Sequence, residues 1–224
     1  MDIELIVIIL LMTTAVFFFF KGKRTKRLAF IDHYTFPSSL YQRINKKYPH
    51  LTQQDISLVF NALKDYFHIC NLANNRMVAM PSQVVDVAWH EFILFTRNYE
   101  NFCRKSLGKF LHHTPTEAMV APTMAQTGIK RAWRLACAKE KINPQTPMRL
   151  PLLFAIDTQL NIPDGFKYSL DCKNPSSPNY GSGYCAGHIG CASGCTGDTG
   201  CSTTGSFFDG SCDSSSCGGG CGGD

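Results

Sequence analysis

Three of the chain's seven histidines, together with Asp86, lie in the segment from Val85 to Pro115. Asp86 and His90 are four residues apart, so on a helix the carboxylate can orient the imidazole or share a metal ion with it. If the chain then folds back along that helix, His112 or His113 joins them. One carboxylate with two imidazoles is a ligand set that suits zinc or ferrous iron.

The same residues also have a structural interpretation. The two adjacent histidines can cap a turn through hydrogen bonds to the backbone, while His90 pairs with Asp86 as a strut. This segment contains no HExxH, no paired CxxC and no GxSxG motif, so its pattern names no reaction. The sequence therefore predicts four candidate ligands, Asp86, His90, His112 and His113, and leaves open whether the protein is an enzyme.

Cys103 is a candidate nucleophile in the same segment. A cysteine hydrolase needs a thiolate next to an imidazole, and His90 projects from a different side of the expected helix. A free cysteine near an apolar stripe is more typical of a small buried hydrophobe, and Cys70 and Cys137 have similar settings. The nucleophile hypothesis therefore ranks below the metal hypothesis.

One long helix is expected to position these groups. It has Ser82 as a candidate N-cap and extends to about Ser106, before Gly108. Asp86, His90 and Arg97 fall together on the side opposite its apolar stripe. The stripe advances in steps of three and four residues and comprises Val85, Ala88, Phe92, Phe95, Tyr99 and Phe102.

Helical patterns also dominate the rest of the central region. A short helix is expected over Ser39–Lys47, and Thr52 with Asp55 resembles a capping box before a second helix. A third amphipathic stretch lies between Gly128 and Pro144. The runs MRLPLLFAID and GFKYSL are expected to form a small pair of strands. The predicted fold class is mainly α, with an N-terminal transmembrane helix, a compact helical domain and a disordered tail rich in Gly, Ser and Cys.

The N-terminus is typical of an uncleaved membrane anchor. Residues 5–20 carry no charge, and as a helix they extend roughly 24 Å, enough to cross a locally thinned bilayer. Asp2 and Glu4 precede this run and five basic residues follow it, which is not the pattern of a cleaved signal peptide. The positive-inside rule then predicts a single-pass membrane protein with its N-terminus outside and its globular domain in the cytoplasm.

The net charge of +5 is explained by this basic cluster. Outside residues 1–27 the chain has 17 Lys and Arg against 15 Asp and Glu, which is nearly balanced. The segment from Lys21 to Arg27 is therefore expected to contact anionic lipid head groups, and no nucleic-acid partner is expected.

The C-terminal region has a separate composition. Fourteen of the 18 glycines follow Tyr180, so the tail cannot build an apolar core. Its cysteine spacing is not that of a zinc finger. In the cytoplasm its thiols are expected to stay free and to bind soft metals or respond to oxidants, and with the opposite topology they would form disulfides. Alternatively, the tail is only a tether. The candidate thiols are Cys185, Cys191, Cys195, Cys201, Cys212, Cys217 and Cys221.

The pattern PSxxVDxxWH, followed by YxxFC, a glycine and HHTP, resembles a block of the glycine-rich-domain-containing (GRDP-like) proteins. It covers about 35 residues, from Pro81 to Pro115. The resemblance implies a helical domain of uncharacterised activity with a glycine-rich C-terminal region. The matching positions are Val85, Asp86, Trp89, His90, Tyr99, Cys103, Gly108, His112, His113 and Pro115.

The expected organisation is an anchor at 1–20, a basic segment at 21–27, a helical domain at 28–170 and a tail at 171–224. Three functions follow from it. The favoured one is a membrane-anchored helical binding or scaffold module with a protein partner. The alternatives are a metal-dependent enzyme that uses the Asp and His cluster, and a redox or metal sensor that uses the tail.

Overall fold

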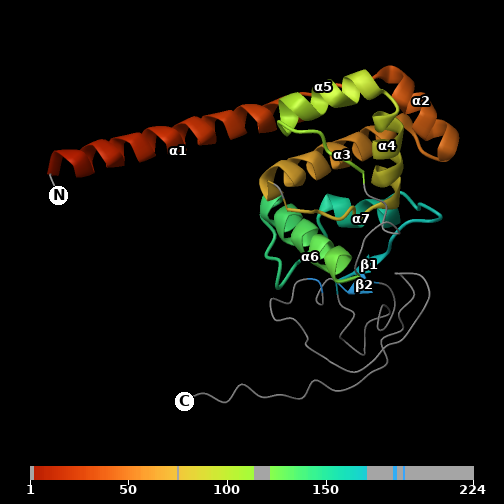
Figure 1. Cartoon of the computed structure of the whole chain (residues 1–224). Coiled ribbons are helices and arrows are strands. Elements are labelled where there is room, and N and C mark those ends of the chain that lie inside the picture. Colours follow the sequence, from red (N-terminus) through yellow and green to blue (C-terminus); the bar gives the residue numbers. More distant parts are fainter. Residues whose placement is uncertain (1–2, 75, 114–121, 171–183, 186–188, 190–224) are drawn as a thin grey trace, which may run out of the picture.

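The computed structural model describes residues 3–74, 76–113, 122–170, 184–185 and 189 (Figure 1). These residues are mainly helical, which confirms the mainly α part of the predicted fold class. The predicted tail lies almost wholly outside them. The elements in chain order are α1 (Ile3–Asp32), α2 (Ser38–Lys47), α3 (Gln53–Ala73), α4 (Gln83–Ile93), α5 (Thr96–Ser106), α6 (Pro122–Lys139), α7 (Leu152–Gln159), β1 (Tyr168–Ser169) and β2 (Tyr184–Cys185).

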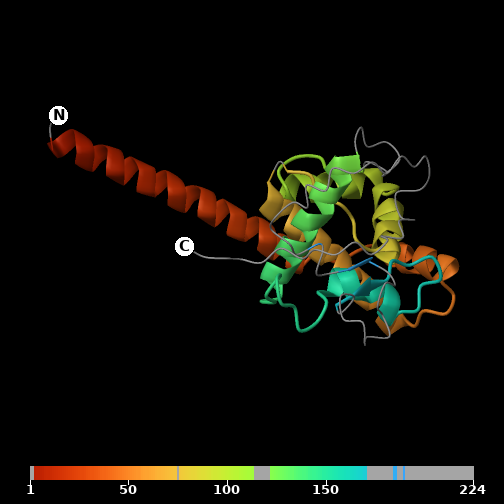
Figure 2. The ribbon, with the colours of Figure 1, turned by 90° about the horizontal axis from the view of Figure 1, so that it is seen from below.

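Helix α1 has two halves with opposite surroundings. Its apolar side chains from Leu5 to Phe20 are exposed, and the helix is long and apolar enough to cross a membrane. Its last turns enter the domain, where Ile31 is fully buried and Phe30 packs against the core. Figures 1 and 2 show one unbroken rod that projects from the helical domain. The apolar half and the domain are therefore joined by a continuous helix.

Helix α3 is the centre of the domain, and α1, α2, α4, α6 and α7 all pack against it. The predicted capping box begins this helix. The Thr52 hydroxyl accepts a hydrogen bond from the Asp55 N–H, and the Asp55 carboxylate accepts one from the Thr52 N–H. Helix α2 starts one residue before its predicted start and ends at Lys47, as predicted.

The predicted long helix from Ser82 to Ser106 is wrong, because the chain breaks it into α4 and α5 at Leu94 and Phe95. In one straight helix Phe92 and Phe102 would lie about 15 Å apart along the axis. The break brings their ring centroids to 5.5 Å. The apolar stripe is thus folded onto itself, and both halves bury their aromatic rings against α3.

Few backbone hydrogen bonds are lost at this break. The Phe95 N–H donates to the Phe92 carbonyl at 3.0 Å, and the Tyr99 N–H donates to the Phe95 carbonyl at 2.8 Å. Burial of a large aromatic side chain contributes about 1.5 to 3 kcal/mol to stability. Packing the aromatic side chains of α4 and α5 together therefore stabilises the fold by more than the few lost helical hydrogen bonds cost.

Helix α6 contains the first part of the predicted amphipathic stretch and buries Ala132, Trp133, Ala136 and Cys137. The predicted strand in MRLPLLFAID is wrong, because this run forms α7 directly after Pro151. A short apolar run fits a strand or a buried helix equally well, and here Leu153, Ile156 and Leu160 recur at helical spacing. The run GFKYSL does contain a strand, β1, which pairs in parallel with β2.

Candidate metal centre

Two side chains fix the N-terminus of α4. The Ser82 hydroxyl accepts a hydrogen bond from the Val85 N–H at 3.3 Å, as the predicted N-cap requires. The carboxylate of Asp157 accepts from the Ser82 hydroxyl at 2.7 Å, and from the N–H groups of Gln83 at 2.7 Å and Val84 at 3.1 Å. A carboxylate at a helix N-terminus also interacts favourably with the helix dipole. The start of α4 is therefore held by Ser82, which directly precedes it, and by Asp157, which lies far along the chain in α7.

Sequence reasoning missed Asp157. It is 2% exposed, and its carboxylate also accepts from the Phe166 N–H at 2.9 Å. The available signal was an acidic residue inside the apolar run LLFAID, because a buried carboxylate needs several donors. Its partner helix could not be read from the sequence.

A chain of hydrogen bonds holds the segment after α5 against α4. The Trp89 indole N–H donates to the Tyr99 hydroxyl at 3.0 Å, and this hydroxyl donates to the Leu111 carbonyl at 2.5 Å. Burial raises the pKa of Tyr99, so the hydroxyl keeps the hydrogen that it donates. This network fixes the backbone two residues before His113.

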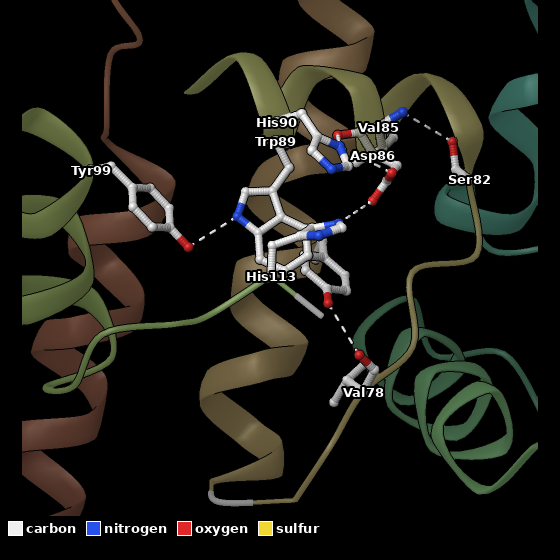
Figure 3. A network of polar contacts seen from close by, with 9 residues as sticks. Val78, Ser82, Val85, Asp86, Trp89, His90, Tyr99 and His113 are labelled. Carbon is white, nitrogen blue, oxygen red and sulfur yellow. Dashed lines mark hydrogen bonds and ion pairs between the residues drawn. The ribbon is translucent and has the colours of Figure 1, made fainter. Parts of the chain in front are cut away.

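The side chains of Asp86, His90 and His113 meet at one place (Figure 3). One carboxylate oxygen of Asp86 lies 3.0 Å from Nε2 of His113, and the other lies 3.1 Å from Nδ1 of His90. The ring centroids of the two histidines are 3.9 Å apart. A hairpin between α4 and the segment after α5 therefore joins residues 27 positions apart, as the sequence predicted.

The cluster is walled on one side and accessible on the other. The side chain of His113 is 14% exposed and its ring packs at 4.5 Å from the Trp89 ring, whereas the side chain of His90 is 50% exposed. One ligand atom from each of the three residues lies within 4.8 Å of the other two. Ligand atoms of a tetrahedral zinc ion lie roughly 3.3 Å apart, so the three side chains are close to that spacing. Nδ1 of His90 also lies 2.9 Å from the backbone carbonyl of Asp86, so this contact must break before that nitrogen binds an ion.

Two residues predicted near this cluster do not join it. His112 is exposed, and its ring lies 4.8 Å from the Phe110 ring. Arg97 is exposed on α5, so the expected strip of Asp86, His90 and Arg97 is wrong because it required a continuous helix.

The buried cysteines are poorly suited to nucleophilic chemistry. Burial raises the pKa of the Cys103 thiol, and it raises that of Cys70 to about 12 and that of Cys137 to about 11. A thiolate is the reactive form, so these side chains are inert thiols near neutral pH.

The other positions that the sequence singled out lie away from this cluster or outside the described residues. Gly108 ends α5 with φ +78°, a backbone conformation that favours glycine. Cys185 belongs to β2. The other positions lie outside the described residues: Pro115, Cys191, Cys195, Cys201, Cys212, Cys217 and Cys221.

Comparison with known proteins gives one family. A family model described as UCP032817-like matches residues 26–189, which include α2 to α7 and the three clustered residues. The resemblance to the GRDP-like proteins is therefore wrong. Its motif covers about 35 residues, several of which cap or pack α4 and α5, and a pattern of that kind is a weak guide to family. No curated protein and no solved structure matches the chain.

Proposed function

Because the chain belongs to the UCP032817-like family, whose description names no reaction, we propose its function from its own geometry. The protein is a membrane-anchored helical module that binds a divalent transition metal through Asp86, His90 and His113. The observation that carries this proposal is one carboxylate placed between two imidazoles from separate segments, each about 3 Å away.

The donor set supports zinc or ferrous iron. Two imidazoles and a carboxylate are common ligands of both ions, and a neutral imidazole must offer a lone pair to the metal. The Trp89 and Tyr99 network acts behind these ligands, because it fixes the backbone that carries His113. A bound ion would tie α4 to the segment after α5 and so stabilise the surface that this hairpin presents to a partner.

The anchoring part of the proposal is supported by α1. This helix is long and apolar enough to cross a membrane, its apolar half is exposed, and it continues directly into the domain. The basic residues after Phe20 favour an N-terminus outside and a cytoplasmic domain. In this arrangement the metal centre serves a binding or scaffold module at the inner membrane surface.

Metal content in matched histidine variants tests the centre. The full chain is purified in nanodiscs, and its metal is quantified by mass spectrometry for the parent, His113→Ala and His112→Ala. We expect about one ion per chain in the parent and in His112→Ala, and a large loss in His113→Ala. Equal metal content in the two variants would refute the assignment of His113.

The tail thiols require a second measurement on the same samples. X-ray absorption distinguishes ligand types, because zinc lies about 2.0–2.1 Å from nitrogen and oxygen ligands and about 2.3 Å from sulfur. A shell of nitrogen and oxygen alone supports the proposed centre. A sulfur shell that survives His113→Ala would assign the metal to cysteines instead.

A second candidate function, a metal-dependent enzyme, is favoured by the number of ligands. Catalytic zinc sites have three protein ligands and an open position for water, and three residues converge among those the structure describes. The half-exposed His90 leaves a route to that position. Hydrolysis of a panel of ester and phosphoester substrates, abolished by a chelator and by His113→Ala but not by His112→Ala, would establish this function.

A further inference from the structure

Basic residues gather where α1 enters the domain. Residues 21–31, 71–80 and 101–113 contain nine of the chain's 22 Lys and Arg and no Asp or Glu. We name these nine residues the basic collar. They are Lys21, Lys23, Arg24, Lys26, Arg27, Arg76, Arg104, Lys105 and Lys109.

Contacts between the three segments make the collar a single surface. The Lys105 ammonium lies 5.8 Å from the centroid of the Phe30 ring, which belongs to α1. Lys109 Nζ donates to the carbonyl of Asn74 at 3.2 Å, which ties the segment after α5 to the end of α3. In Figures 1 and 2, α2 and α4 lie at the end of the domain that is farther from the exposed half of α1.

Two arginines of the collar are occupied by helix ends. Arg24 Nη2 donates to the Leu72 carbonyl in the last turn of α3, at 3.5 Å. Arg27 covers the end of α5, because its guanidinium occupies the space that a Cβ at Gly108 would take. Helix C-termini carry partial negative charge, which these two cations offset. The domain is thereby fixed to α1 at the level of the collar.

Three other basic side chains of the domain are available for a partner outside the protein. Arg76, Arg104 and Lys105 are exposed, and none of them forms an ion pair with a carboxylate of the described residues. Elsewhere Arg43 pairs with Glu91, and Lys139 pairs with Asp65. The exposed acidic residues at the borders of the three segments are Asp32 and Glu100, so the collar keeps a large excess of positive charge. An exposed surface with such an excess is complementary to an anionic surface.

The distance along α1 identifies that surface. Arg27 lies seven residues beyond Phe20, or about 10 Å along the helix. The polar layer on each side of the hydrocarbon core is roughly 5–7 Å thick. If residues 5–20 span the bilayer, the long side chains from Lys21 to Arg27 reach the phosphate groups of the lipids. Lys105 lies beside Phe30, which is about 15 Å beyond Phe20 along the helix, at the outer edge of that layer.

We propose that Arg76, Arg104 and Lys105 bind anionic lipid head groups, so that the domain rests on the bilayer by its basic collar. The ends of α3 and α5 then face the lipid, while α2 and α4 face away from it. This inference rests on the membrane span of the proposed function and is independent of the metal centre.

Lysine footprinting of the full chain tests this contact. The protein is placed in nanodiscs of phosphatidylcholine alone or with phosphatidylglycerol, and acetylation of each lysine is followed by mass spectrometry. Lys105 reports on the collar, and the exposed Lys46 on α2 is the internal control. We expect acetylation of Lys105 to slow about fivefold in the anionic discs and to recover in high salt, while that of Lys46 stays unchanged.

A variant separates the collar from a general charge effect. Arg76→Gln with Arg104→Gln should restore much of the acetylation of Lys105 in anionic discs. Lys47→Gln with Lys167→Gln removes the same charge from exposed positions outside the collar and should not restore it. Equal acetylation of Lys105 in the two disc types would overturn the contact, whereas a chain that does not remain in the discs would refute the membrane span itself.

Discussion

Asp157 and Asp86 both lie beside the first turns of α4, and their surroundings differ in kind. The carboxylate of Asp157 is buried and accepts four hydrogen bonds, three of them from backbone N–H groups. That of Asp86 is partly exposed, and its carboxylate oxygens face two side chains, His90 and His113. Backbone N–H groups are fixed in position by the fold, whereas imidazole side chains can rotate to share a metal ion. The first carboxylate therefore supports the fold, and the second is the one that the proposed metal centre uses.

The largest expected effect comes from removing the supporting carboxylate. Asp157→Ala leaves the N–H groups of Gln83, Val84 and Phe166 without their acceptor in a buried place. We expect the free energy of unfolding to fall by about 3–4 kcal/mol, measured by urea denaturation in detergent.

Asp164→Ala is the control for this change, because among the described residues Asp164 accepts only from the side chains of Tyr48 and Gln83, and it is itself exposed. It should cost about 1 kcal/mol. A loss for Asp157→Ala no larger than that for Asp164→Ala would remove the distinction between the two carboxylates of α4.

The second effect concerns the network that carries His113. Tyr99→Phe removes the bond to the Leu111 carbonyl and leaves the Trp89 indole N–H without its acceptor. We expect a loss of about 1–3 kcal/mol in the free energy of unfolding, and metal affinity about 10-fold to 100-fold weaker. Urea denaturation and metal titration measure the two effects. Tyr41→Phe removes the hydroxyl from a half-buried ring that packs on Phe60, and it should change the free energy of unfolding and the metal affinity much less.

The third prediction addresses Asp86 directly. Asp86→Asn keeps the size of the side chain but removes the negative charge that would stabilise a bound divalent ion. We expect metal binding to be lost, while the free energy of unfolding without metal changes by less than about 1 kcal/mol. The same pair of measurements on Asp157→Asn should show the reverse order, with stability more affected than metal binding. If both variants lose stability equally, Asp86 is a structural residue.

The local parts of this structure could be predicted from the sequence. The capping box of α3 and the N-cap of α4 depend on residues three positions apart, and the apolar leader is a matter of composition. The pairing of Asp86 with His90 follows from helical spacing. A hairpin between the helix and the segment that follows it could also be expected, and it brings one of the two adjacent histidines to this pair.

The parts that were mispredicted depend on distant contacts. The stripe from Val85 to Phe102 fits one helix or two equally well, and no Gly or Pro marks the break at Leu94 and Phe95. The choice of His113 over His112 depends on how the backbone is held at Leu111, which the Trp89 and Tyr99 network decides. The role of Asp157 depends on donors more than 70 positions away.

The smallest expected effect comes from a third carboxylate at a helix start, Asp55 of α3, which is partly exposed. The Thr52 side chain and the Thr52 N–H both donate to it, and these hydrogen bonds lower the pKa of Asp55. Because the folded pKa is below the unfolded one, its stabilising contribution is complete above about pH 4 and is lost as the pH falls through the folded value. Hydrogen exchange of the first turn of α3 should therefore be faster in Asp55→Asn than in the parent at neutral pH, and the two should converge in acid. A difference that persists unchanged in acid would show that the ionised carboxylate does not hold this turn.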